Sequence, residues 1–264
     1  MLELIVLASG SSGNASIVRD SETERSLLID CGICKREFFM RCDSVDVNPL
    51  EIEAVLITHA HTDHTSGIGV VMRGLAKLGC TPSIYTHPAT RAASKPIAET
   101  EKLLEQRDLV QGEPFEAAGI VVTPFPTSHD SGGSTCFRFQ AGGDTIGYVT
   151  DTGVITPEAH EALQGVRILS IESNHDVKML EEGPYPYPLK QRILGAGGHL
   201  SNAQCCEEVA LLLHPKLEHI AAMHVSEHNN TFSLPARELA KTLDMRGHDA
   251  RIHVARPDRP IRIS

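Results

Sequence analysis

The sequence has few aromatic residues and no long hydrophobic run. Aromatic side chains make up 4% of the 264 residues and tryptophan is absent, so aliphatic side chains must fill the interior. No apolar stretch reaches the roughly 18 residues that a membrane-spanning helix needs. The hydrophobic content of 41% still suffices for a sizeable core. We expect one domain over residues 1–264, long enough to contain two sheets.

The chain also lacks a basic leader and an even set of cysteines. Residues Met1–Leu7 carry no small-residue cleavage pattern and predict a first strand rather than a signal peptide. The seven cysteines are scattered, and Cys31 and Cys34 have redox spacing without a thioredoxin-like context. We therefore expect reduced thiols, no cysteine metal ligand, and a cytoplasmic protein without a membrane partner. The oligomeric state stays open.

Positive charge is scarce, and the formal net charge is −10. Taken alone, this argues against a protein that coats itself with nucleic acid. Metal-binding carboxylates contribute to that charge, however, and bound cations reverse its sign locally. The overall charge therefore excludes little about the substrate.

A dense cluster of ligand-type side chains follows a short apolar strand predicted at Ala54–Ile57. His59, His61, Asp63 and His64 fall within six residues. On an extended backbone His59 and His61 point the same way and can share one ion, and the adjacent Asp63 and His64 can hold a second. Imidazoles and carboxylates suit a divalent metal of borderline softness. Because packed histidines without a ligand are costly to bury, the cluster predicts a metal centre rather than a solvated loop.

Other ligand-type residues come directly after predicted strands. These are Asp30 after Ser26–Ile29, His129 after Gly119–Pro124, Asp151 after Thr145–Val149, Glu172 after Arg167–Ile171, and His224 after His219–Met223. Ligand sites in such folds gather at one edge of the sheets. The recurrence predicts one composite site assembled from several strand ends.

The remaining pattern mixes strands and helices. Further strands are expected at Leu2–Leu7, Ser16–Val18, Ser83–Thr86, Cys136–Phe139 and Ile252–Val254, and helices at Cys34–Arg41, Gly67–Leu78, Ala89–Leu104 with an interruption at Pro96, Ser201 or Asn202 to Leu213, and Pro235–Arg246. The small-residue turn Ser9–Asn14 either cradles phosphate or brings backbone close to the site, although it lacks the Lys-Ser/Thr of a P-loop. The stretch Tyr185–Pro188 is interpreted as an exposed linker.

These residues resemble the metallo-β-lactamase superfamily. The motif His59-x-His61-x-Asp63-His64 carries the likeness, and Asp30, His129, Asp151 and His224 follow in the family's order. Six segments are similar to the YycJ/WalJ branch: Leu28–Gly32, Pro126–Asp130, Val149–Gly153, Glu172–Asp176, Gly198–Asn202 and Ser226–Asn230. That branch is related to RNase Z and RNase J and is associated with 5′-to-3′ exonuclease activity on DNA.

The resemblance implies an α/β fold, a four-layer αββα sandwich of two mixed β-sheets. It also implies two divalent metal ions, Zn²⁺ or Mn²⁺. One ion would bind His59, His61 and His129, the other would bind Asp63, His64 and His224, Asp151 would bridge both, and Asp30 would orient a ligand histidine. Two ions about 3.5–4 Å apart can share a hydroxide and clamp a phosphate oxygen.

The same resemblance assigns the proton chemistry. A histidine in a similar Gly-His motif of RNase Z-like enzymes donates a proton with help from a glutamate, which implies this role for His199 and Glu172; with Asp63 they are the catalytic candidates. Candidates for phosphate contact or proton transfer are His175, Ser226, His228 and Asn229, each with a purely structural alternative. Lys178, Lys190 and Arg192 either line a strand-tracking groove or form a solvated charged face.

We therefore expect a dinuclear metal-dependent phosphodiesterase, specifically a 5′-to-3′ DNA exonuclease with nucleic acid as its partner. The first alternative is a hydrolase of a small ester, thioester, lactone or cyclic nucleotide. The second is a metal-bound sensor without turnover. The pairing of His199 with Glu172 favours the nuclease, because expelling an alkoxide needs an acid. A flavodiiron role would usually need a glutamate in place of His61, and no segment resembles the extra domain of RNase J or the arm of RNase Z.

Overall fold

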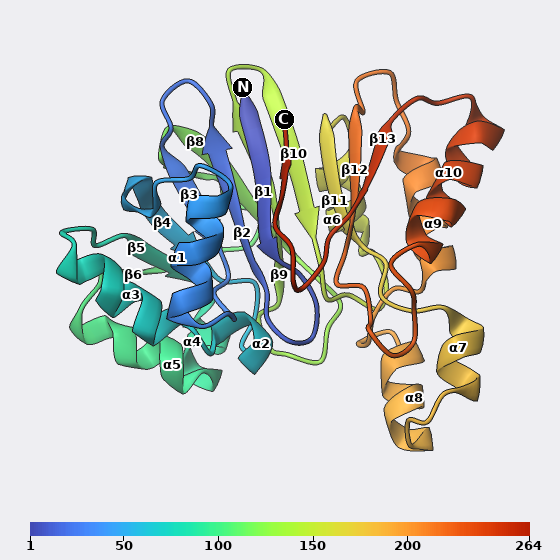
Figure 1. Ribbon diagram of the computed structural model, residues 1–264, viewed down its shortest axis with the longest axis horizontal. Helices are drawn as coiled ribbons and strands as arrows, with labels where there is room; N and C mark the ends of the chain where they lie inside the picture. Colours follow the sequence, from blue (N-terminus) through green and yellow to red (C-terminus); the bar gives the residue numbers. More distant parts are fainter.

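The computed structural model describes residues 1–264 as two β-sheets packed face to face with helices on both outer faces (Figure 1). The first sheet has the strand order β14-β1-β2-β3-β4-β5-β6, with β1 Leu2–Ala8, β2 Ala15–Asp20, β3 Ser26–Ile29, β4 Ile52–Leu56, β5 Ser83–Thr86, β6 Gln106–Asp108 and β14 Ile261–Ile263. The second has the order β13-β12-β11-β10-β9-β8-β7, with β7 Phe115–Ala117, β8 Ile120–Pro126, β9 Thr135–Ala141, β10 Asp144–Val149, β11 Ile168–Glu172, β12 His219–Met223 and β13 Arg251–Val254. This confirms the predicted αββα sandwich.

Helices lie on both sides of the sandwich, most of them over the outer face of a sheet. They are α1 Lys35–Ser44, α2 Thr62–Thr65, α3 Ile68–Lys77, α4 Pro88–Ala93, α5 Lys95–Glu99, α6 Pro157–Leu163, α7 Val177–Glu182, α8 Tyr187–Leu194, α9 Asn202–Leu212 and α10 Leu234–Arg246, with 3₁₀ turns at Pro49–Glu51 and Thr100–Lys102. Ser201, one of the two N-caps expected from the sequence, caps α9 through a reciprocal pair of bonds with Gln204. None of these helices combines the length and apolar character needed to cross a membrane.

Parallel pairing decides where the strands end. Strands β3 to β6 are parallel in the first sheet, and β10 to β13 are parallel in the second. The two parallel sets finish at the same edge of the sandwich, the lower edge in Figure 1. Loops that follow these strands therefore meet in one place.

Three aliphatic clusters hold the layers together. One lies between the sheets and includes Leu4, Ile29, Phe137 and Met223. A second joins the first sheet to α1, α3 and α5, and a third joins the second sheet to α6, α9 and α10. The apolar side chains alternate between the inner and outer clusters along β1, as a strand buried on both faces requires.

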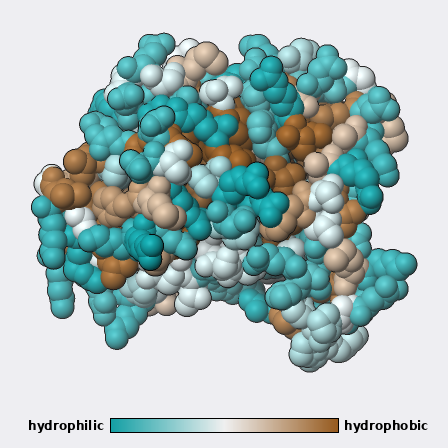
Figure 2. All heavy atoms as spheres, in the orientation of Figure 1, coloured by the Kyte–Doolittle hydropathy of each residue, from teal (hydrophilic) through white to brown (hydrophobic).

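Several elements differ from the sequence prediction. Tyr185–Pro188 is not a linker throughout, because α8 begins at Tyr187; Pro188 is tolerated in its first turn, where no intrahelical N–H is needed. Strands β6, β7 and β14 were not predicted because each spans three residues at or near a sheet edge. The exposed surface is mostly hydrophilic, and the α7–α8 pair stands out from the body at the lower right (Figure 2).

Candidate metal centre

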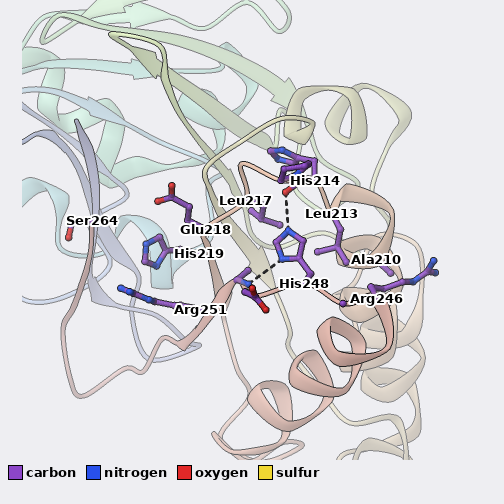
Figure 3. Close-up of a pocket in the computed structure, with 14 residues that line it drawn as sticks. Ala210, Leu213, His214, Leu217, Glu218, His219, Arg246, His248, Arg251 and Ser264 are labelled. Atoms are coloured by element: carbon purple, nitrogen blue, oxygen red, sulfur yellow. Dashed lines mark hydrogen bonds between the residues drawn. The ribbon is translucent and has the colours of Figure 1, made fainter.

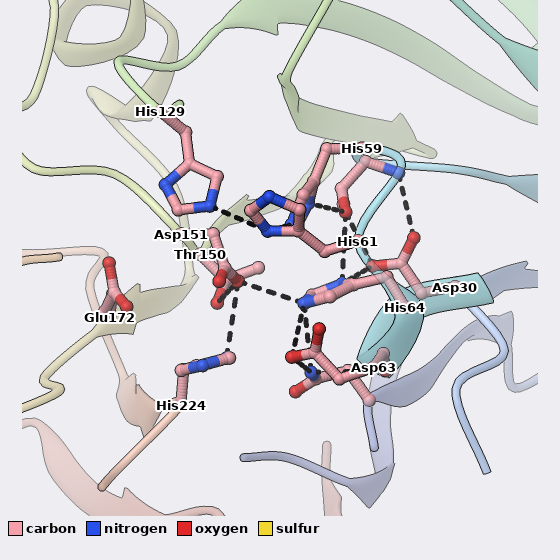
Figure 4. A network of polar contacts seen from close by, with 12 residues as sticks. Asp30, His59, His61, Asp63, His64, His129, Thr150, Asp151, Glu172 and His224 are labelled. Carbon is pink, nitrogen blue, oxygen red and sulfur yellow. Dashed lines mark hydrogen bonds and ion pairs between the residues drawn. The ribbon is translucent and has the colours of Figure 1, made fainter. Parts of the chain in front are cut away.

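All predicted ligand residues lie together at the edge where the parallel strands end (Figure 4). The loop after β4 and the short helix α2 supply His59, His61, Asp63 and His64 from the first sheet, and the second sheet supplies His129 after β8, Asp151 after β10 and His224 after β12. Neither sheet holds a complete site by itself. The site exists only where the two sheets face each other.

One group of ring nitrogens converges on His61. Its Nδ1 lies 3.1 Å from His59 Nε2 and 3.2 Å from His129 Nε2. Burial lowers the pKa of His59 well below its usual range and also lowers the pKa of His61, so both rings are neutral, the form that binds metal. The Nδ1 of His129 lies 3.0 Å from the Gly198 carbonyl oxygen and donates its proton there, which leaves Nε2 with a free lone pair.

A second group forms around Asp151. Its Oδ2 lies 3.3 Å from His64 Nε2 and 3.3 Å from His224 Nδ1, and Asp63 Oδ2 lies 3.4 Å from His64 Nε2. Burial alone would raise the pKa of Asp151, but the facing imidazoles hold it well below its usual range. The ligand atoms of Asp151, His59 and His64 also lie within 4.8 Å of one another, so Asp151 stands between the two groups.

The donor set fits divalent metal ions. Three imidazole nitrogens facing one another cannot all be satisfied by protons, and the buried His224 Nδ1 has no hydrogen-bond partner in the protein. Nitrogen and carboxylate oxygen together suit metals of borderline softness such as Zn²⁺, and also Mn²⁺. The clusters of His59, His61 and His129, and of Asp63, His64 and His224, each offer three ligand atoms within 4.8 Å of one another.

A histidine–glutamate pair stands beside this centre. His199 Nδ1 lies 2.7 Å from Glu172 Oε1, and its ring stacks on His224 at a centroid distance of 5.3 Å. Glu172 is fully buried and held by the backbone N–H groups of Thr152 and Leu200. Burial acts to lower the pKa of His199, but the Glu172 carboxylate outweighs it and raises the pKa to about 9. The imidazole is therefore protonated at neutral pH.

Known proteins with similar sequences identify the family. Residues 25–224 match the family described as "Beta-lactamase superfamily domain". Exodeoxyribonuclease WalJ of Streptococcus pneumoniae serotype 2 (strain D39 / NCTC 7466) is 31% identical over 96% of this chain and 94% of that protein. The chain belongs to the metallo-β-lactamase superfamily.

Two further similarities extend over the whole chain. Exodeoxyribonuclease YycJ of Bacillus anthracis is 29% identical over 99% of this chain and 98% of that protein. The crystal structure of the metallo-β-lactamase fold protein YhfI from Bacillus subtilis superimposes with a TM-score of 0.71 at 16% identity, covering 100% of both chains, which is a likeness of fold. The chain is thus a metallo-β-lactamase superfamily hydrolase of the YycJ/WalJ branch, which confirms the expected family and enzyme class.

Asp30 lies behind the predicted ligands of this site rather than among them. Its fully buried carboxylate accepts hydrogen bonds from the Thr58 backbone N–H at 2.9 Å and from the Thr58 hydroxyl at 2.8 Å. Its Oδ2 also lies 2.7 Å from His64 Nδ1. This contact fixes the imidazole with Nε2 turned toward Asp63 and Asp151, which is the geometry of an orienting carboxylate.

We expect Asp30→Asn to weaken divalent-metal binding by about 10- to 100-fold, the usual effect of losing a partner behind a metal ligand. The carboxylate accepts hydrogen bonds from Thr58 and His64, and the amide of asparagine would instead point an N–H group at one of these donors. Titration calorimetry with Mn²⁺ measures the change. The control is Asp46→Asn at an exposed turn with the same left-handed backbone, φ 50° against 58° at Asp30. Equal Mn²⁺ affinity in the wild type, Asp30→Asn and Asp46→Asn would show that Asp30 does not orient a metal ligand.

The backbone is strained where three of these residues leave their strands. Asp30, Asp151 and His224 have φ values of 58°, 54° and 51°, in the left-handed region that residues with a Cβ adopt at a cost. In each case a buried strand ends and the chain turns sharply toward the centre. The turn aims Asp151 at His64 of the other sheet, whereas it aims Asp30 at Thr58 and His64 beside the neighbouring strand of its own sheet.

Sequence reasoning missed two residues that hold the ligands in place. Asn14 donates its backbone N–H to the Asp63 carbonyl at 2.8 Å, and its Nδ2 lies 3.2 Å from Asp63 Oδ2 and 3.0 Å from His64 Nε2. The Ser9 hydroxyl accepts the backbone N–H of His224 at 2.8 Å. The turn containing them therefore brings backbone close to the site. Its small residues were the only signal in the sequence.

The residues predicted to contact substrate differ in location and exposure. Ser226 and Asn229 line a pocket that also touches His129 and His199. His228 is exposed beside Tyr185, with a centroid distance of 5.9 Å. His175 is 1% exposed, which favours the structural alternative left open for this residue over a direct phosphate contact; burial lowers its pKa to about 4 and keeps the ring neutral beneath the site.

The three basic residues of the α7–α8 pair lie in two different settings. Lys178 is exposed and pairs with Glu182 on its own helix, and Lys190 Nζ donates to the Glu181 carbonyl oxygen at 2.7 Å. These two form a solvated face. Arg192 pairs with Asp130 and lines the pocket beside the metal centre.

The largest cavity lies at the opposite edge, near the start of β12 and β13, and has a volume of about 850 Å³ (Figure 3). Two of its three histidines bond to the backbone. His214 Nε2 donates to the Val166 carbonyl and its Nδ1 accepts from Lys216 N, while His248 Nε2 donates to the His214 carbonyl and its Nδ1 accepts from Ala250 N. The third, His219, has its Nδ1 3.0 Å from His253 Nε2. This cavity holds none of the groups of three or more ligand-type side chains found at the strand-end site.

Proposed function

We propose that this hydrolase is a dinuclear metal-dependent phosphodiesterase that degrades DNA from the 5′ end. The single observation that carries the proposal is the 2.7 Å contact between Glu172 and His199 beside two adjoining ligand clusters. Hydrolysis of a strained or activated small molecule needs no strong acid, whereas expelling a sugar alkoxide does. Two relatives that are similar over nearly the whole chain bear the name exodeoxyribonuclease, which supports this choice.

The proposed centre would place His59, His61 and His129 on one ion, and Asp63, His64 and His224 on the other, with Asp151 between them. When bound, the metal ions would supply an activated water near neutral pH and offset the negative charge of the phosphate. Asp63 is 22% exposed and so reaches the open side of the centre, where it would orient the attacking water.

His199 would deliver the proton to the leaving 3′-oxygen. Its Nδ1 is engaged with Glu172, so Nε2 carries the transferable proton. The backbone N–H groups of Thr152 and Leu200 hold Glu172 still, at 2.8 and 3.3 Å. The acid is therefore positioned by groups that do not change during the reaction, which keeps the cost of reorganisation low.

The experiment compares 5′- and 3′-labelled single- and double-stranded DNA and RNA, each with Mn²⁺ or Zn²⁺. We expect stepwise loss of nucleotides from the 5′ end of DNA, which requires added metal and stops with a chelator. Shortening from the 3′ end would contradict the polarity. Cleavage of a cyclic nucleotide or thioester without any cleavage of DNA would contradict the phosphodiesterase proposal in favour of a small-molecule hydrolase.

A further inference from the structure

A small pocket lies between the metal centre and the α7–α8 pair. Its volume is about 180 Å³, below the roughly 300–1,000 Å³ of pockets for drug-sized ligands. His129 and His199 form one wall, and Tyr185, Leu189 and Arg192 form the other. The pair that forms the second wall stands out from the body of the protein (Figure 1). The pocket adjoins the candidate proton donor, so its occupant would sit next to the reacting phosphate.

The floor of this pocket carries polar groups that the protein does not satisfy. The Asn229 side chain is 1% exposed, and its Oδ1 has no hydrogen-bond partner. The Ser226 hydroxyl oxygen accepts the N–H groups of His228 and Asn229 at 3.3 and 3.1 Å, which leaves its own proton free to donate. Buried polar groups are almost always paired, so the free Ser226 proton indicates a ligand with a hydrogen-bond acceptor. Asn229 Oδ1 is itself an acceptor and does not bind a phosphate oxygen.

The outer wall adds a positive charge and an aromatic ring. The Arg192 Nε pairs with Asp130, and the two terminal nitrogens of the guanidinium have no partner in the protein. Tyr185 is half-buried at the rim, and Leu189 beside it is also partly covered. Free donors next to an aromatic face match a nucleotide, whose phosphate accepts hydrogen bonds and whose base stacks.

We propose that this pocket holds one unpaired nucleotide at the end of the strand, with its phosphate against Ser226 and Arg192 and its base on Tyr185. This rests on the proposed phosphodiesterase function and adds the form of the substrate. A pocket of this size has no room for a base pair, and its far side is lined by Tyr185 and by the α8 residues Leu189 and Arg192. The enzyme would therefore act on free ends and release mononucleotides.

The test compares Tyr185→Ala with Tyr187→Ala, using a linear single-stranded oligonucleotide, bis(p-nitrophenyl) phosphate and dAMP as an inhibitor. Tyr187 is a matched control, since it belongs to the same segment and is 72% exposed. We expect Tyr185→Ala to raise both KM for the oligonucleotide and the inhibition constant of dAMP by about 5- to 150-fold, the loss of one stacked base. Tyr187→Ala should match the wild type, and Tyr185→Phe should retain most of the affinity.

The outcomes separate the pocket from the phosphodiesterase. Unchanged dAMP inhibition in Tyr185→Ala, or an equal loss in Tyr187→Ala, overturns the pocket assignment even if hydrolysis of the small phosphodiester is normal. Rapid cutting of circular single-stranded DNA overturns the requirement for a free end. If the wild type hydrolyses no phosphodiester, the proposed function fails, and calorimetric binding of dAMP to wild type and Tyr185→Ala still decides for or against the pocket.

Discussion

Replacing His61 by alanine should abolish metal-dependent hydrolysis while the protein stays folded. Its Nδ1 is the nitrogen on which His59 and His129 converge, at 3.1 and 3.2 Å. Removing it leaves His59, His129 and the shared Asp151 in one of the proposed metal sites, which is too few to hold a divalent ion in a closed four-ligand shell. We expect activity on bis(p-nitrophenyl) phosphate to fall by more than about 100-fold, since even a partner behind a ligand affects activity by 10- to 100-fold.

A matched control separates the metal effect from the loss of a histidine. His61 is 34% exposed and His160 is 31% exposed, but His160 lies on α6 and contacts Glu208 outside the site. His160→Ala should keep full activity and metal content, whereas His61→Ala should lose bound metal by mass spectrometry. The thermal midpoints of the two metal-free variants should agree. Retained activity in His61→Ala would contradict the assignment of two metal ions to this site.

The second large effect concerns His199, whose replacement by alanine should depend on the leaving group. A positioned general acid contributes about 10²- to 10⁴-fold, and a sugar alkoxide needs that proton. We therefore expect cleavage of DNA to slow by this factor. Hydrolysis of a nitrophenyl ester should slow far less, because nitrophenolate leaves without protonation. The loss should appear in kcat, since the proton is transferred during the chemical step.

Glu172 provides the companion measurement. It touches His199 but not the substrate, so Glu172→Gln should reproduce the same dependence on the leaving group in weaker form. The backbone N–H groups of Thr152 and Leu200 donate to Glu172 Oε2. In Glu172→Gln the side-chain amide oxygen can occupy the Oε2 position and accept the same two bonds. Equal losses on DNA and on the nitrophenyl ester in His199→Ala would remove His199 from the acid role.

The parts of the site that sequence could predict are those in which residue type alone specifies a chemistry. His59, His61 and His64 with Asp63 form an unusual composition, and Asp151 and His224 each follow a recognisable apolar strand. Their convergence followed from the rule that parallel strands end at one edge of a sheet. The fold class followed from the same pattern.

The parts that could not be predicted depend on contacts between distant segments. Asn14 and Ser9 are ordinary polar residues in a turn, and only the packed fold brings them to Asp63 and His224. Strand β14 is three residues long and owes its conformation to pairing with β1 rather than to its own composition. Tyr187 begins a helix with Pro188 in its first turn, where proline is tolerated, so the linker-like composition of Tyr185–Pro188 concealed the start of α8.

The division of the metal centre between two sheets has a consequence for how the enzyme matures in the cell. Chains emerge from the ribosome at about 5–20 residues per second, with the N-terminal part first. The His59–His64 segment is therefore made well before β12, which begins at His219 and carries His224 at its end. A nascent chain offers four of the seven predicted ligands in this segment, and the other three join them once the second sheet docks on the first. The complete proposed centre therefore forms only after the two sheets have packed together, and a product truncated before His224 would lack one of its predicted ligands.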